Sequence, residues 1–170
     1  MEIEIRDEEE RDLEQVRAIL RANFPTEAES KLVDALRASG KAIISLVSVN
    51  KNNDGEVLGH ILFSPVSTTP LVEVKGIGLA PVAVRRDVQS LGIGSRLIRE
   101  GLHLCRELEY DYCVVLGDPK YYQRFGFQKA SSLGLQNEYG ADDEFMVIRY
   151  TARIPAGMVN YALDFALFSV

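Results

Sequence analysis

Cysteine is scarce in this chain of 170 residues, which contains only Cys105 and Cys113. Two cysteines in apolar surroundings are too few for a disulfide framework, so we expect two small buried hydrophobic residues in a reducing compartment. Long hydrophobic runs are lacking as well, because the longest, 42–49 and 112–116, are far shorter than a membrane span. The charged start, Met-Glu-Ile-Glu-Ile-Arg, has no apolar core of a signal peptide. These features predict a cytoplasmic protein without a membrane partner.

A surplus of basic residues is also absent. The chain has 25 acidic and 19 basic residues, which give a formal net charge of −6. Nonspecific binding of DNA or RNA requires a basic surface, so we expect no nucleic-acid partner. The charge balance says less about small anions, since main-chain amides in a loop can bind phosphate whatever the net charge.

The sequence contains no internal repeats, low-complexity tracts or linker. Its apolar fraction of 46% is ordinary for a globular protein, which argues against disorder. A chain of this length suits one domain and buries roughly 70% of the surface of its unfolded form. We therefore predict a single domain over residues 1–170.

Hydrophobic periodicity and turn residues predict an alternation of strands and helices. Thr26, with Glu29 three residues later, predicts a capping box at the start of the second helix. Pro65 and Pro70 predict a looser stretch between two strands. We expect helices at about 9–22, 26–39, 92–108 and 119–126. We expect strands at about 3–5, 42–49, 56–63, 72–84, 112–116, 145–150 and 158–162.

The order of these elements defines the fold class. The runs 42–49 and 56–63 are joined by a polar loop and predict an antiparallel hairpin. Strand, loop, helix and strand over 82–116 predict one βαβ unit, in which 82–84 and 112–116 run parallel. The prediction is an α/β (α+β) fold with a mixed, mostly antiparallel central sheet flanked by helices.

The loop at 89–95, Gln-Ser-Leu-Gly-Ile-Gly-Ser, leads from a strand into a helix. Its two glycines let the backbone approach a ligand closely, and the helix N-terminus adds unpaired N–H groups and partial positive charge. Such a loop suits a phosphate or pyrophosphate, although a bare Gly-x-Gly is more often only a tight turn. Two nucleotide motifs are excluded: a dinucleotide fingerprint lacks its third glycine at Leu97, and no Gly-Lys-Ser/Thr occurs.

Several segments taken in order carry a resemblance to a known family. They are Leu-Ala-Pro-Val-Ala-Val at 79–84, Gln-x-x-Gly-x-Gly at 89–94, Val-Val-Leu-Gly-Asp-Pro at 114–119 and Tyr-Gln-Arg-Phe-Gly-Phe at 122–127. Together they resemble the GNAT superfamily of N-acetyltransferases, and the last two resemble a bacterial subgroup of it. The order of elements matches that family from about residue 3 to about residue 150, and the parallel βαβ unit then carries the acyl-CoA loop.

The resemblance implies an N-acetyltransferase with acetyl-CoA as co-substrate, no metal, and a primary amine of an unidentified small molecule or protein as acceptor. The strand at 82–84 would bind the pantetheine arm through main-chain groups, and amides of the loop would bind the pyrophosphate. Tyr122 would protonate the departing thiolate, which a phenol with a pKa of about 10 can do at neutral pH. The implied cofactor-binding residues are Val82, Ala83, Val84, Gln89, Ser90, Leu91, Gly92, Ile93, Gly94 and Ser95.

Several points stay open at the level of sequence. Ser90, Leu91 and Ser95 stand where the family often has arginines, so pyrophosphate binding would depend on amides and hydroxyls. No general base is assigned: Glu56, His60, Glu73 and Asp118 are the candidates, and a water chain is an alternative. The missing base also suggests a rival function, a non-catalytic acyl-CoA-binding sensor or interaction module. The apolar stretch 161–168 must bury itself against the domain or, in a homodimer, against a second copy.

Overall fold

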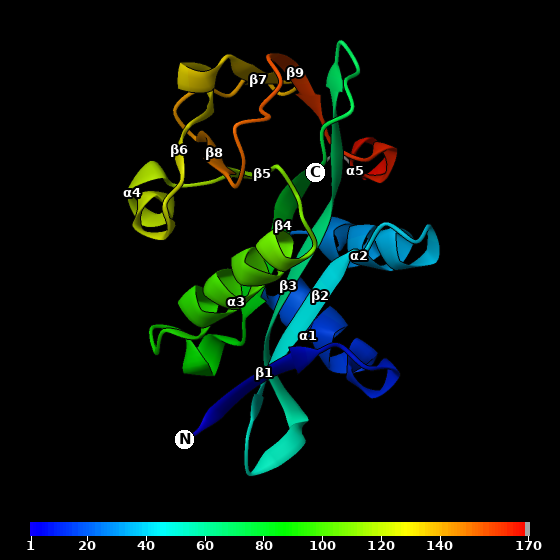
Figure 1. Ribbon diagram of the computed structural model, residues 1–170. Helices are drawn as coiled ribbons and strands as arrows, with labels where there is room; N and C mark the ends of the chain where they lie inside the picture. The colour runs from blue at the N-terminus through cyan, green and yellow to red at the C-terminus, as the bar shows by residue number, and fades with distance from the viewer. Residues whose placement is uncertain (169–170) are drawn as a thin grey trace. The chain divides into compact units, whose positions relative to one another are not determined.

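The computed structural model describes residues 1–168 of the chain (Figure 1). These residues form two compact units, each made of several segments. The first unit contains Met1–Phe63, Pro81–Gly101 and the C-terminal segment from Leu163 onward. The second contains Ser64–Ala80 and Leu102–Ala162. Whether residues 1–170 form a single domain stays a prediction.

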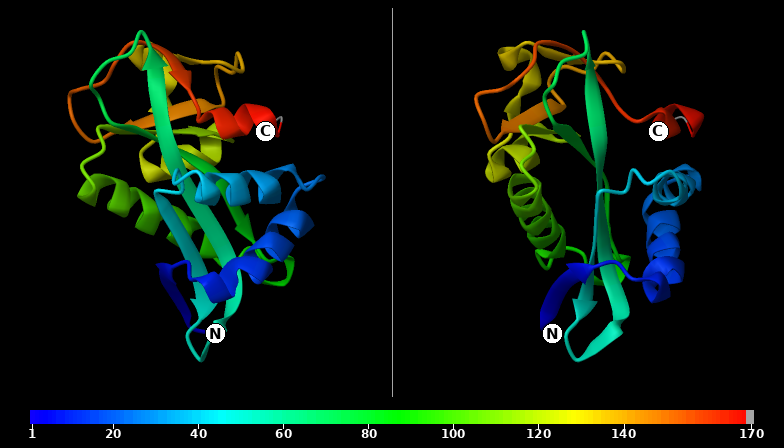
Figure 2. Two further views of the ribbon diagram at one scale, coloured as in Figure 1. Left: turned by 90° about the vertical axis from the view of Figure 1, so that its right-hand side faces the viewer. Right: turned by 45° about the vertical axis from the view of Figure 1, so that its right-hand side comes forward.

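The first unit is a sheet in the order β1-β2-β3-β4, covered by helices. Figure 2 shows α1 and α2 on one face of β2 and β3, and the first turns of α3 on the other face. Two glycines permit that second contact, because a side chain at Gly59 would meet Leu97 and one at Gly101 would meet Phe63. Its strands are β1 (Ile3–Asp7), β2 (Ile44–Asn50), β3 (Asn53–Thr69, as far as Phe63) and β4 (Gly76–Val84, from Pro81). Its helices are η1 (Glu10–Asp12), α1 (Leu13–Asn23), α2 (Ala28–Ala38), η2 (Arg86–Val88), α3 (Ile93–Glu107, as far as Gly101) and α5 (Leu163–Leu167).

The predicted hairpin is confirmed, and its turn is tighter than the polar loop at 50–55 indicates. β2 and β3 pair antiparallel up to Asn50 opposite Asn53. The Asn50 side-chain oxygen accepts a hydrogen bond from the Asn52 amide at 3.1 Å, so the turn occupies two residues. The predicted capping box is wrong: Thr26 Oγ1 accepts from the Ala28 amide at 3.2 Å, and α2 begins at Ala28 after Glu27.

The second unit contains two parallel strand pairs and several short antiparallel pairings. β4 pairs parallel with β5 (Tyr112–Leu116), and β5 pairs antiparallel with β8 (Phe145–Arg149). β6 (Gln128–Lys129) pairs with the other side of β8. β9 (Gly157–Asn160) pairs antiparallel with the end of β3 and parallel with β7 (Leu135–Asn137). The helices are the last turns of α3, α4 (Pro119–Tyr122), η3 (Gln123–Phe125) and η4 (Ala130–Leu133).

Two strand predictions need correction. The expected loose stretch is strand, since β3 continues through Pro65 to Thr69 and pairs with β9, from Ser67 opposite Asn160 onward. The parallel ladder with β5 involves the first half of β4, from Gly76 to Leu79, and not the predicted 82–84. The ladder stops before Pro81, which has no N–H to donate. Residues 82–84 therefore lie beyond the described parallel pairing.

The apolar stretch at the C-terminus is partly covered within its own unit. Phe165 of α5 is buried, and Asp164 forms an ion pair with Lys41 at 2.9 Å. Leu163 and Leu167 are exposed, at 80% and 75%. Residues 169–170 of this part of the chain lie outside the described residues, and the homodimer stays a prediction.

The expected burial of the two cysteines is confirmed, because Cys105 and Cys113 are buried free thiols. Among the helices described, none is both long and apolar enough to cross a membrane.

Candidate functional site

The loop between β4 and α3, in the first unit, contains two residues with a left-handed backbone conformation. Ser90 and Gly92 have positive φ angles of 67° and 82°. Gly92 O accepts a hydrogen bond from the Arg96 amide at 3.1 Å, and α3 begins at Ile93. The first N–H groups of an α-helix have no acceptor within the helix and carry partial positive charge. The first turn of α3 places such N–H groups directly after the loop.

The outer side of this loop is open. A Cβ placed on Gly92 would have no heavy atom within 4 Å among the described residues, apart from its chain neighbours. Leu91 beside it is 65% exposed, although it is a large apolar residue. An open, glycine-lined turn at a helix N-terminus fits a bound anionic group.

Two side-chain amides hold the start of the loop. Gln89 Nε2 donates to Val84 O at 3.0 Å and to Asn23 Oδ1 at 2.9 Å. Asn23 Nδ2 donates to the same Val84 O at 3.0 Å and to Ile19 O at 2.8 Å. The two N–H groups of Gln89 Nε2 are therefore used inside the protein, and its side chain anchors the loop to the end of α1. Sequence reasoning missed Asn23, whose only signal is its place at the last helical residue before Phe24-Pro25.

The end of β4 presents main-chain groups on one edge. The Arg85 amide donates to Leu58 O of β3 at 2.8 Å. Since consecutive residues of a strand direct their N–H and C=O groups to opposite edges, Ala83 faces β3, and Val82 and Val84 face the other edge. Val84 O is the acceptor for Gln89 and Asn23. Both Val82 and Val84 therefore direct main-chain groups to that edge, and the Val84 oxygen is used by these two side chains.

The arginines before the loop have structural partners. Arg85 pairs with Asp87 at 2.6 Å and with Glu56 at 3.1 Å, and its guanidinium lowers the pKa of Asp87. Arg86 Nε donates to Ala22 O at 2.7 Å. These contacts hold both guanidinium groups within the fold.

Tyr122, in the second unit, is buried in an aromatic cluster at the end of α4. Asp118 caps this helix, because its Oδ1 accepts from the Lys120 amide at 3.0 Å. The Tyr122 ring makes edge contacts with Tyr121 at 5.1 Å and with Phe127 at 5.7 Å between ring centroids. Burial raises the pKa of Tyr122 to about 12. The hydroxyl is therefore protonated at neutral pH and can donate a proton.

The sequence profile of the acetyltransferase (GNAT) family matches residues 13–127, a stretch that contains both the loop and Tyr122. The chain belongs to the GNAT family. It is 37% identical over 133 residues to Escherichia coli YhbS, described as an uncharacterized N-acetyltransferase, with 78% of each chain covered.

Solved GNAT structures agree with this fold. The structure of Escherichia coli YhbS in complex with CoA gives a TM-score of 0.89 at 33% identity, covering 96% of this chain and 92% of that chain. A GNAT family acetyltransferase from Brucella melitensis in complex with acetyl-CoA gives 0.80 at 35% identity, covering 96% and 98%. The predicted mixed, mostly antiparallel sheet with a parallel βαβ unit, β4–α3–β5, is therefore confirmed.

Three of the four candidates for a general base in this GNAT chain have structural contacts. Glu56 pairs with Arg85, and Asp118 caps α4. His60 is completely buried in β3. Glu73 is exposed in the connection between β3 and β4, and its main-chain oxygen accepts from Arg153 at 2.6 Å.

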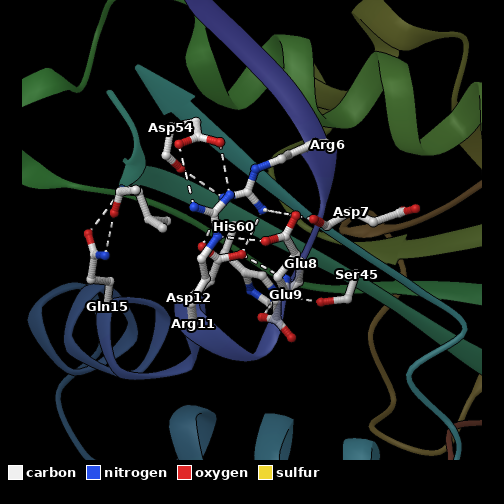
Figure 3. Close-up of polar contacts among 12 residues, drawn as sticks. Arg6, Asp7, Glu8, Glu9, Arg11, Asp12, Gln15, Ser45, Asp54 and His60 are labelled. Atoms are coloured by element: carbon white, nitrogen blue, oxygen red, sulfur yellow. Dashed lines mark hydrogen bonds and ion pairs between the residues drawn. The ribbon is translucent and has the colours of Figure 1, made fainter. Parts of the chain in front are cut away.

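His60 belongs to a buried polar cluster of the first unit (Figure 3). Its Nε2 lies 2.8 Å from Ser45 Oγ and 3.3 Å from Glu8 Oε2. Arg37 binds both oxygens of Glu8, at 2.8 and 2.6 Å. His60 Nδ1 has no hydrogen-bond partner among the described residues. Serine and carboxylate meet the same ring nitrogen, so this is not the serine–histidine–acid relay, in which they contact opposite nitrogens.

Burial and the nearby Arg37 lower the pKa of His60 to about 3. The Glu8 carboxylate acts in the opposite direction, but Arg37 neutralises it, and desolvation of the imidazolium prevails. His60 is therefore a neutral residue of the fold at physiological pH.

A second ion cluster lies beside the first (Figure 3). Asp12 is fully buried, and its carboxylate accepts from Arg6 at 2.7 and 3.0 Å and from the Glu9 amide at 2.7 Å. Arg6 also donates to Asp54 O at 2.8 Å. Within the residues that the structure describes, no group of three or more histidine, cysteine or acidic side chains could hold a metal ion.

Proposed function

We propose that this chain transfers the acetyl group of acetyl-CoA to a primary amine of a small-molecule or protein acceptor. The observation that carries the proposal is the open, amide-lined turn at 89–95 in a chain of the GNAT family. The crystallised relatives, at 33% and 35% identity, hold CoA or acetyl-CoA. Acetyl-CoA, when bound, supplies a thioester whose carbonyl is electrophilic and whose thiolate is a good leaving group.

The residues of the first unit would bind the donor by its polar parts. Amides from Ser90 to Ser95 would hold the pyrophosphate, with the α3 N-terminus adding favourable electrostatics. The main chain of Val82, which faces away from β3, would bind the pantetheine arm in the manner of an added strand, with Ala83 and Val84 beside it. The open space above Gly92 supports this fit, since any side chain at that position would project into it.

Tyr122 would donate the proton to the departing thiolate. The phenol is protonated throughout the neutral range because its pKa lies near 12. A main-chain amide of β4 would polarise the carbonyl oxygen, and the protein would contribute positioning and electrostatic stabilisation. Cys105 and Cys113 are fully buried, so direct attack by the amine, without a covalent enzyme intermediate, is the route we propose.

The amine acceptor must lose a proton before it attacks, since an alkylammonium has a pKa of about 10.4. Glu56, His60 and Asp118 have structural contacts. The fourth candidate, Glu73, is exposed in the connection between β3 and β4. We therefore propose that the proton leaves through ordered water to bulk solvent, and Glu73 is the alternative acceptor.

The test is release of free thiol from acetyl-CoA by the purified full chain across a broad panel of amines. Tyr122→Phe is the matched control, because it removes only the hydroxyl. Transfer to at least one amine, with kcat reduced about 100-fold or more in Tyr122→Phe, is the expected result. An unchanged rate in Tyr122→Phe would contradict the acid role.

The second candidate function is a non-catalytic acyl-CoA-binding module. The specific observation that favours it is that three of the four acidic or histidine candidates for a base are held in structural contacts. Calorimetry would separate the two functions. Binding of CoA without transfer to any amine would support the module, and binding with transfer would support the enzyme.

A further inference from the structure

We infer that Gly117 is a positioning residue for Tyr122: the missing side chain at position 117 leaves the space that the Tyr122 ring fills. The inference rests on the proposed function, because the catalytic role of Tyr122 belongs to that proposal. Both residues lie in the second unit, Gly117 directly after β5 and Tyr122 at the end of α4.

The geometry of the contact is unusually close. A Cβ built on Gly117 would lie 2.2 Å from Tyr122 Cε2, 2.8 Å from Cδ2 and 3.3 Å from Cζ. Non-bonded carbon atoms pack at about 3.5–4.0 Å. The ring edge therefore packs directly against the main chain of Gly117, and even the methyl group of alanine would overlap it.

The backbone conformation does not explain the glycine. The left-handed glycines of the described chain are Gly40, Gly92, Gly126, Gly134, Gly140 and Gly157, and Gly117 is not among them. Its amide donates an ordinary hydrogen bond to Glu144 O at 2.9 Å. An alanine could adopt this backbone without strain, so the neighbouring ring is what requires a glycine here.

The other contacts of the Tyr122 ring restrict its movement away from Gly117. Phe127 and Tyr121 meet it nearly edge-on, at interplanar angles of 82° and 88°. Phe125 lies at 6.2 Å between centroids. The helix that carries Tyr122 is fixed by the Asp118 cap and by the Tyr122 amide, which donates to Asp118 O at 3.0 Å. A methyl group at position 117 would therefore displace the Tyr122 ring, and with it the hydroxyl, by about an ångström.

The kinetic consequence follows from that displacement. A catalytic group misplaced by about 1 Å can cost about 100-fold in rate. Gly117→Ala is expected to lower kcat about 100-fold and to leave KM for acetyl-CoA nearly unchanged, because the loop at 89–95 is untouched. Substitution of a residue that contributes only to folding stability would not lower kcat while leaving KM unchanged.

The matched control is Gly101→Ala. A Cβ at Gly101 would lie 2.2 Å from the Phe63 ring, which is as close as the contact at Gly117 but involves a different aromatic residue. We expect Gly101→Ala to lower the urea midpoint while the folded protein keeps its kcat. An equal loss of kcat in both variants would overturn the inference, since any loss of packing would then suffice.

A double-mutant cycle tests whether Gly117 acts through Tyr122. In a Tyr122→Phe background, Gly117→Ala is expected to change kcat less than twofold, because the hydroxyl that it misplaces is already gone. A further 100-fold loss in that background would overturn the inference.

A cycle in stability covers the case in which Gly117→Ala does not fold. Replacing Tyr122 by alanine removes the ring, so Gly117→Ala/Tyr122→Ala is expected to fold with the urea midpoint of Tyr122→Ala. This readout needs no activity, so it separates the two proposals. If the destabilisation by Gly117→Ala disappears in the Tyr122→Ala background but no variant or unaltered chain transfers acetyl groups, the packing contact is retained and the proposed function is refuted. If Gly117→Ala destabilises both backgrounds equally, the packing contact itself is refuted.

Discussion

The side-chain amide of Gln89 donates a hydrogen bond to the main-chain oxygen of Val84, 3.0 Å away. Asn23 donates to the same oxygen from the end of α1. The Val84 oxygen, at the end of β4, thus connects the first residue of the proposed pyrophosphate loop to the end of α1. The conformation of the loop therefore depends on a main-chain oxygen five residues before Gln89.

Loss of this anchor is expected to weaken acetyl-CoA binding. Gln89→Ala removes two hydrogen bonds that are each worth about 1 kcal/mol, so binding up to about 30-fold weaker is expected. Calorimetric titration with CoA measures the change. Gln15→Ala is the control, because Gln15 makes comparable main-chain bonds with Gly55 and Val57, and its CoA affinity should equal that of the unaltered chain. Equal weakening in both variants would show that the anchor has no specific role.

Gly92→Ala is expected to lower CoA affinity by tenfold or more. The substitution places a methyl group in the open space on the outer side of the loop and strains a residue with φ of 82° by about 1–2 kcal/mol. Gly40→Ala provides the control, because Gly40 has a φ of 73° and also has no atom within 4 Å of its Cβ position. Both variants should lose similar stability in urea, and only Gly92→Ala should lose affinity in calorimetry.

Acidification is expected to destabilise the fold through His60 before the carboxylates titrate. Histidine in the unfolded chain has a pKa of about 6.5, and burial lowers the pKa of His60 to about 3. Between these values the unfolded chain binds a proton at residue 60 and the folded chain does not. Stability is therefore lost as the pH falls below 6.5, with a slope of up to about 1.4 kcal/mol per pH unit.

Urea unfolding between pH 6.5 and 4.5 measures this slope. The groups that face His60 are Ser45, Glu8 and Arg37, so His60→Gln keeps a neutral polar group among them. His60→Gln should flatten the dependence, and His103→Gln, at a side chain that is 61% exposed, should not. The expectation fails if both variants keep the full slope.

At alkaline pH, kcat is expected to show no decrease caused by deprotonation of Tyr122. Since the pKa of Tyr122 lies near 12, kcat should not fall between pH 8 and 10. The measurement is acetyl transfer as a function of pH, with Tyr122→Phe as the comparison. A fall in kcat with an apparent pKa near 9 that is absent from Tyr122→Phe would contradict the assignment.

Local patterns in the sequence predicted the elements that depend on neighbouring residues. The turn at Gly92, the start of α3 and the burial of Cys105 and Cys113 follow from glycine chemistry and helical periodicity. In each case the physical cause lies within a few residues of its effect.

Contacts between distant segments were not predictable from such patterns. β3 continues past Pro65 because β9, about 90 residues later in the chain, pairs with it. Gln89 donates a hydrogen bond to Asn23, which is 66 residues away in the sequence. In the sequence Gly117 resembles an ordinary turn glycine, and only the structure places the Tyr122 ring against it. Propensity at a single position contains no information on such partners.

The guanidinium of Arg6 joins three segments of the first unit: β1, the turn before α1 at Asp12, and the tip of the β2–β3 hairpin at Asp54. Asp12 is fully buried, so opening any of these segments exposes a charge pair that the other two help to hold. The three segments should therefore open as one cooperative unit, and their slowest amides should exchange with deuterium at a common free energy. We therefore expect the N-terminal strand, although it lies at the edge of the sheet, to open together with these segments and not to fray by itself.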